Sequence, residues 1–113
     1  MEQDIEIEVR NRDGSTVVAA RGEVDVATAP ALRDGLEEAL DHDIGAVVVD
    51  LTGVTFIDST GLGVLIGARR RCVEAGRELR VVVVEPRILK VFEITGLTEL
   101  FTIHASLEPA LGA

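Results

Sequence analysis

The sequence predicts a mixed α/β fold in which an N-terminal antiparallel hairpin joins parallel strands, with about four helices. Residues 5–9 alternate apolar and charged side chains, the pattern of a strand with one solvated face. Residues 46–51 and 79–84 are continuous apolar runs rich in valine, which is typical of buried parallel strands. Segments with helical spacing separate these runs, so we expect right-handed crossovers between the strands. At 113 residues the chain is expected to be one domain over residues 1–113.

The hairpin comes first in the chain. Ile5, Ile7 and Val9 alternate with charged residues, so the first strand is expected to be an edge strand. The polar and glycine residues of 11–15 predict a turn, and residues 16–21 predict the second strand. The two strands should pair in antiparallel fashion.

The first helix is expected to carry Pro30 in its first turn, where proline is favoured, and to end before Asp43. Its apolar side consists of Leu32, Leu36, Ala39 and Leu40. The next strand, Ala46–Leu51, is expected to be closed by Thr52 and Gly53, where the continuous apolar run ends.

The C-terminal part of the chain predicts three short elements after the strand at residues 79–84. Pro86 should open a helix that ends near Gly96. Residues 100–103 predict a short last strand, and Ser106 is expected to cap a final helical turn or two.

Between these parts lies the helix that bears on function, predicted over residues 59–74 by apolar residues at helical spacing. The inward-facing set is Leu62, Leu65, Ile66 and Val73. Either Asp58 or Ser59 is expected to be the N-cap, where a side-chain oxygen stabilises a helix by about 1 kcal/mol. The first N–H groups and the helix dipole also suit a phosphate group. A serine here is therefore either a plain cap or a phosphorylation site.

The opposite face of this helix is small and partly apolar. It consists of Thr60, Val64, Gly67, Ala68 and Arg71. Gly61, Gly63 and Gly67 would each destabilise a helix interior by roughly 0.5–1 kcal/mol relative to alanine. We expect a compensating role, and a face of this kind suits close approach by another surface.

Composition argues against several classes of function. The formal net charge of −9 argues against direct nucleic-acid binding, because phosphates would be repelled. Cys72 is the single cysteine and has no companions at metal-ligand spacing. We read it as a small hydrophobic residue of the helix. With no pattern of a catalytic triad either, we expect no metal, no cofactor and no catalytic activity of the chain itself.

The expected location is the cytoplasm. No apolar run approaches the roughly 20 residues that span a bilayer, and the N-terminus Met1–Asp4 is acidic, unlike a signal peptide. We therefore expect no membrane contact. The expected oligomeric state is a monomer or weak dimer.

Three stretches stand out as a set: Phe56–Val64 (FIDSTGLGV), Gly22–Asp25 before the first helix, and Val91–Leu97 near the end. In this order and at these distances they closely resemble the signature of the anti-sigma-factor antagonists, the bacterial STAS-domain proteins. The likeness covers nearly the whole chain and implies the same fold, a STAS domain over residues 1–113.

The resemblance implies a binding protein that is switched by phosphorylation. In this family the unphosphorylated protein binds an anti-sigma factor, itself a serine kinase, and thereby frees a sigma factor. Phosphorylation of the serine after the aspartate ends the binding, and a separate serine phosphatase restores it. By position that serine is Ser59, with Thr60 as the nearest competing acceptor. A phosphate adds about −1.5 to −2 charges beside Asp58, yet the helix dipole favours it, so we expect the interface to change and the fold to persist.

The remaining site residues each have a structural alternative. Asp25 and Asp58 either cap helices or lie on the binding surface, and the two roles are compatible. The glycines and Val64 are either packing residues or the floor of the partner interface. The partner-binding set implied by the resemblance is Asp25, Asp58, Ser59, Thr60, Gly61, Gly63, Val64 and Gly67.

Two other classes of function compete with this one. The three glycines also resemble the glycine-rich loop of a dinucleotide-binding enzyme, with Glu85 at about the distance of a ribose-binding acid. That loop needs its first glycine at the end of a strand, whereas the strand here is expected to end near Leu51. No second domain would hold a substrate. The other class is a scaffold or regulatory subunit of a larger signalling complex, or a separated regulatory domain of a transporter.

Overall fold

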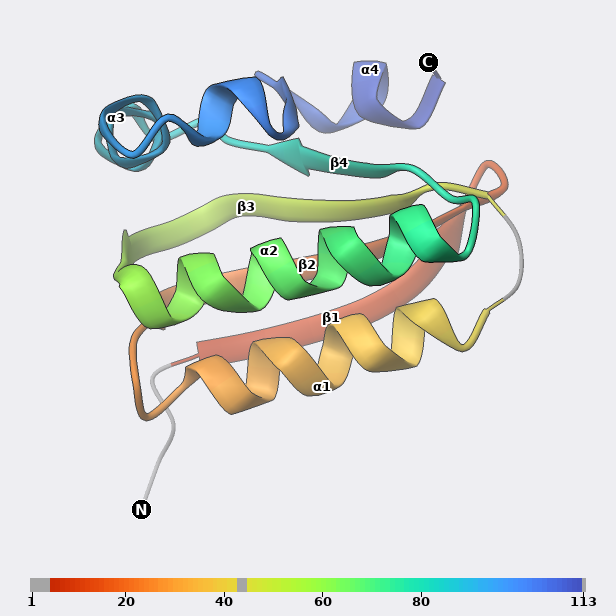
Figure 1. Cartoon of the computed structure of the whole chain (residues 1–113), viewed down its shortest axis with the longest axis horizontal. Helices are drawn as coiled ribbons and strands as arrows, with labels where there is room; N and C mark the ends of the chain where they lie inside the picture. The colour runs from red at the N-terminus through yellow and green to blue at the C-terminus, as the bar shows by residue number, and fades with distance from the viewer. Residues whose placement is uncertain (1–4, 43–44, 113) are drawn as a thin grey trace.

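The computed structural model describes residues 5–42 and 45–112, so the acidic N-terminus and Asp43 lie outside the described residues. Its sheet has five strands in the order β1-β2-β3-β4-β5 (Figure 1). Only the β1–β2 pair is antiparallel. The strands are β1 (Ile5–Arg12), β2 (Ser15–Val24), β3 (Val47–Ile57), β4 (Leu79–Val82) and β5 (Thr102–His104). The helices are α1 (Ala29–Leu40), α2 (Ser59–Glu74), α3 (Pro86–Ile94), the short 3-10 helix η1 (Leu97–Glu99) and α4 (Leu107–Gly112). The predicted fold class is confirmed.

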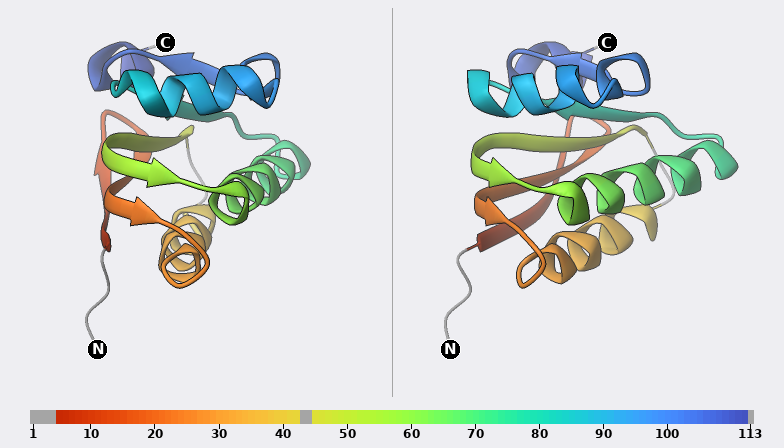
Figure 2. Two further views of the ribbon diagram at one scale, coloured as in Figure 1. Left: turned by 90° about the vertical axis from the view of Figure 1, so that its left-hand side faces the viewer. Right: turned by 60° about the vertical axis from the view of Figure 1, so that its left-hand side comes forward.

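Two apolar clusters hold the helices on the sheet. The larger joins Leu32 and Leu36 of α1 and Leu65 of α2 to the strand residues Val49 and Leu51, all fully buried. Helices α1 and α2 lie side by side over this face (Figure 2). The smaller cluster, on the alternate strand residues, contains Val17, Val48, Val82, Ala110 and Leu111. Helix α4 therefore covers part of the other face. None of the helices described is long and apolar enough to cross a membrane.

The hairpin turn is tighter than the predicted turn over residues 11–15. Strand β1 runs to Arg12, which pairs with Ser15, so only Asp13 and Gly14 form the turn. Both adopt left-handed backbone conformations, with φ of 53° and 82°. Because aspartate and glycine tolerate this conformation, the pair makes the two-residue connection that matches the twist of a hairpin.

Strand β3 is longer than predicted, and the expected end at Thr52 and Gly53 is wrong. It continues to Ile57 because β2 also continues, to Val24, and pairs with it as far as Ile57, across a register shift between Gly22 and Glu23. A Cβ on Gly53 would lie 2.5 Å from Cγ of Arg21, so this glycine permits close approach within the sheet. Conversely, β4 is shorter than the predicted run to residue 84.

The long parallel pair places two loops next to one another at the carboxyl edge of the sheet. The N–H of Asp58 donates to the carbonyl oxygen of Val24 at 3.2 Å. The β2–α1 loop therefore begins beside the start of α2. The candidate site lies where this loop and the start of α2 meet.

Candidate functional site

Asp58 is the N-cap of α2. Its Oδ1 accepts hydrogen bonds from the N–H groups of Thr60 (2.9 Å) and Gly61 (3.2 Å). Its backbone carbonyl accepts from the N–H of Leu62 at 3.0 Å. Ser59 is therefore the first helical residue, and the alternative in which it is the N-cap is wrong. Its side chain is exposed and has no hydrogen-bond partner among the described residues.

Asp25 stabilises the turn before α1. The expectation that it caps α1 is wrong, because the N-cap residue lies three positions later. The Oδ1 of Asp25 accepts from the N–H groups of Ala27 (2.9 Å) and Thr28 (3.0 Å). Thr28 is the N-cap residue of α1, and its hydroxyl donates to the carbonyl of Glu23 at 2.7 Å. A separate turn thus precedes the helix. Since Val24 accepts from the N–H of Asp58, Asp25 and Asp58 both follow directly on paired strand ends.

The three glycines of α2 have different surroundings. Gly61 is buried, and a Cβ there would lie 2.6 Å from Cγ1 of Val24 and 2.8 Å from Cγ1 of Ile57. Its small size is required by core packing. At Gly63 and Gly67 an added Cβ would meet no heavy atom within 4 Å. Those two glycines leave open surface that internal packing does not require.

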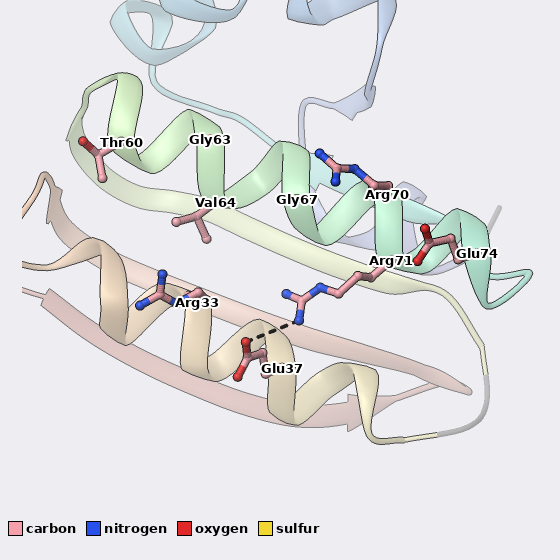
Figure 3. Close-up of a pocket in the computed structure, with 9 residues that line it drawn as sticks. All are labelled: Arg33, Glu37, Thr60, Gly63, Val64, Gly67, Arg70, Arg71 and Glu74. Carbon is pink, nitrogen blue, oxygen red and sulfur yellow. Dashed lines mark hydrogen bonds and ion pairs between the residues drawn. The ribbon is translucent and has the colours of Figure 1, made fainter.

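A groove of about 540 Å³ runs between α1 and α2 (Figure 3). Its lining residues are Arg33, Glu37, Thr60, Gly63, Val64, Gly67, Arg70, Arg71 and Glu74. Arg71 bridges the two helices, with its Nη1 3.3 Å from Oε2 of Glu37. The groove therefore contains Thr60, next to Ser59, together with the two open glycines.

The assignment of residues to the inward and outward faces of α2 is wrong at two residues. Ala68 is fully buried rather than outward, and Val73, expected in the core, is 58% exposed. The inward stripe follows Gly61, Leu65, Ala68 and Cys72 at helical spacing. Val73 lies one residue beyond Cys72, about 100° around the helix, and so misses the core.

Cys72 is fully buried as a small apolar residue, as predicted. Burial raises the pKa of its thiol above the ordinary value of 9.0, although the positive charges of Arg77 and Arg71 act in the opposite direction. Among the described residues, no three His, Cys, Asp or Glu side chains are grouped so that they could hold a metal ion.

Comparison with known proteins identifies the fold and its relatives. Residues 6–110 match the family model described as the STAS domain. The chain belongs to the STAS domain family. This STAS domain is 36% identical over 101 residues to an anti-sigma-B factor antagonist of Listeria monocytogenes, covering 88% of the chain and 89% of that protein. It is 33% identical over 105 residues to the anti-sigma-B factor antagonist of Staphylococcus aureus, covering 93% and 97%.

A solved structure is equally similar to this STAS domain. The crystal structure of an anti-sigma factor antagonist from Mycobacterium paratuberculosis superposes with a TM-score of 0.87 at 32% sequence identity. The match covers 95% of this chain and 91% of that one. The family resemblance predicted from the three motifs is confirmed.

The geometry of the STAS domain does not fit a dinucleotide-binding loop. Gly61, Gly63 and Gly67 all lie inside α2, not in the loop between strand and helix. The strand ends at Ile57 and not near Leu51, yet the first glycine still follows the helix start. Glu85, the candidate ribose-binding acid, is the N-cap of α3 and accepts from the N–H of Arg87 at 3.2 Å.

Sequence reasoning missed the α1 wall of the groove. Arg33 and Glu37 are one helical turn apart and exposed, on the side of α1 away from Leu32 and Leu36. This spacing is a signal for a shared polar face. That the face borders α2 follows only from the way the two helices pack.

Proposed function

We propose that this STAS domain is an anti-sigma factor antagonist whose binding to its partner is switched off by phosphorylation of Ser59. One observation carries the proposal: the Ser59 side chain is exposed at the start of α2, and Asp58 performs the capping role in its place. The hydroxyl is therefore free for modification. The relatives from Listeria monocytogenes and Staphylococcus aureus are anti-sigma-B factor antagonists, which supports the same role here. The partners we propose are an anti-sigma factor with serine kinase activity and a serine phosphatase.

The binding surface we propose extends from the carboxyl edge of the sheet onto the outer face of α2. It includes Asp25, Asp58, Ser59 and Thr60 at the edge. On the helix it includes Gly63, Val64 and Gly67, because these residues are accessible and a neighbour can approach the backbone closely. We assign buried Gly61 a supporting role, since its lack of a side chain lets the first turn of α2 rest on Val24 and Ile57.

The physical basis of the switch is the charge that a phosphate adds at an exposed position. It would bring about −1.5 to −2 charges at pH 7. Burying that charge against a partner is unfavourable unless matching donors are supplied. Within the domain itself, the positive end of the α2 dipole favours the charge. The interface should therefore be lost while the fold persists.

Three variants test this proposal. Wild type, Ser59→Ala and Ser59→Asp are immobilised and exposed to extract of the native host, and the captured proteins are identified by mass spectrometry. We expect wild type and Ser59→Ala to retain an anti-sigma factor and Ser59→Asp to retain little. The purified partner and ATP should phosphorylate wild type at Ser59, as fragment spectra locate it. Thr60→Val is the matched control and should still be phosphorylated.

Two results would contradict the proposal. One is phosphate on Thr60 or elsewhere with Ser59 unmodified. The other is a Ser59→Asp protein that loses its native amide spectrum, because the fold would then be the target of the charge. Capture of other STAS-domain proteins without an anti-sigma factor would favour a scaffold role.

A further inference from the structure

The groove between α1 and α2 carries positive charge on a protein that is strongly acidic overall. The chain has a formal net charge of −9, yet three of the nine residues that line the groove are arginines and two are glutamates. Arg71 is paired with Glu37 across the groove. Arg33 and Arg70 form no ion pair among the described residues. Two cations thus remain uncompensated beside the groove, and Glu74 lies at its far end.

The two unpaired arginines flank the open part of α2. Arg33 lies on α1, across the groove from Thr60 and Val64, and Arg70 lies along α2 beside Gly67 (Figure 3). Between them the surface is formed by Val64 and by two glycines with nothing within 4 Å of an added Cβ. A chain segment lying over the glycines would have a guanidinium on either side.

We propose that this groove receives an acidic segment of the anti-sigma factor, with Arg33 and Arg70 pairing with its carboxylates. The inference rests on the proposed function and names the chemistry of the partner. A guanidinium suits a carboxylate because it offers a planar fork of donors. Complementary charge also speeds encounter and selects the partner, and both effects weaken as salt is added.

The same arrangement couples the groove to Ser59. Thr60 lines the groove at the start of α2 and directly follows Ser59, so a phosphate on Ser59 would stand near that end of the groove, across which Arg33 lies on α1 (Figure 3). Its negative charge would repel an acidic segment there and compete with it for Arg33. Neither Asp25 nor Asp58 forms an ion pair with Arg33 among the described residues, so this arginine is available to an incoming carboxylate.

The experiment compares neutralised arginines by titration calorimetry against the purified anti-sigma factor. Arg33→Gln and Arg70→Gln are each expected to weaken binding about tenfold. Their affinities should also respond less to salt between about 50 mM and about 300 mM NaCl. Arg10→Gln is the matched control: it removes an exposed positive charge on β1, outside the groove, and should bind as wild type does. Melting curves verify that every variant is folded.

A second measurement tests the coupling to Ser59. Phosphoserine is incorporated genetically at position 59 in wild type and in Arg33→Gln. We expect the phosphate to reduce affinity by a smaller factor in Arg33→Gln, since the shared arginine is gone.

The outcomes separate the two proposals. If wild type binds no anti-sigma factor, the proposed function fails and this inference with it. If wild type binds and Arg33→Gln and Arg70→Gln bind equally well, only the acidic segment in the groove is refuted. Tighter binding by the neutralised variants would show that the partner segment is basic, which also overturns it.

Discussion

Alanine substitutions at the three glycines of α2 should distinguish two open positions, Gly63 and Gly67, from one that core packing requires, Gly61. Alanine is favoured over glycine in a helix interior by about 0.5–1 kcal/mol. At Gly63 and Gly67 an added Cβ meets no heavy atom within 4 Å, so we expect the full gain at each. With an entropy of unfolding near 2.1 cal/mol/K per residue, about 1 kcal/mol raises the Tm of a chain of this length by about 4 °C.

Gly61→Ala is expected to act in the opposite direction. Its Cβ would lie 2.6 Å from Cγ1 of Val24 and 2.8 Å from Cγ1 of Ile57, two buried side chains. Overpacking of this kind typically costs about 1–3 kcal/mol. The gain in helix propensity offsets part of it, which leaves a net loss of about 1–2 kcal/mol. The Tm should fall by roughly 4–8 °C.

Urea unfolding followed by circular dichroism, together with calorimetric melting, measures these changes in the free energy of unfolding. The reasoning is refuted if Gly63→Ala or Gly67→Ala lowers stability, or if Gly61→Ala raises it as much as they do. A binding assay adds a second readout. On the proposed function, the two stabilised variants should bind the anti-sigma factor more weakly than wild type, because the new methyl groups occupy the surface that the partner approaches.

Three further predictions concern single side chains. Asp58→Ala removes the cap of α2 and should lower the free energy of unfolding by about 1 kcal/mol, whereas Asp58→Asn should retain most of it; urea midpoints check this. Arg80→Met removes the Nη1 donor to the carbonyl of Ala110 (2.7 Å) and should cost about 1–3 kcal/mol, with faster amide hydrogen exchange in α4. Burial raises the pKa of the Cys72 thiol in the folded protein above its ordinary value of 9.0. The stability that this thiol contributes is fully present below pH 9.0, where it is protonated in both the folded and the unfolded chain, and is lost as the pH rises through the folded pKa. The stability of wild type relative to Cys72→Ala should therefore decline as the pH rises above 9.0, and a constant difference would contradict the assignment.

Local signals predicted the central helix well. An aspartate followed by apolar residues at helical spacing marks where a helix begins, and α2 begins and ends where this pattern indicates, at Ser59 and Glu74. The strands could be predicted in the same way, because alternating apolar residues indicate an edge strand and continuous apolar runs indicate buried strands. These features depend only on neighbours along the chain.

What could not be predicted depends on contacts between distant segments. Thr52 and Gly53 read as a strand end, and only the partner β2 shows why they continue the sheet. Likewise, the charges of Arg33 and Glu37 are visible in the sequence, but the groove they border exists only because α1 packs against α2. The residues of the candidate site on α2 could thus be named from the sequence, whereas those on α1 could not.

The occupied donors at the start of α2 bear on how long a phosphate could stay on Ser59. The N–H groups of Thr60, Gly61 and Leu62 are all bonded to Asp58, through its side chain or its carbonyl. A phosphate would therefore be attracted by the helix dipole but would not receive hydrogen bonds from these three N–H groups. A modification held so loosely remains accessible to hydrolysis by a second enzyme, which lets the protein return to its starting state and be used again.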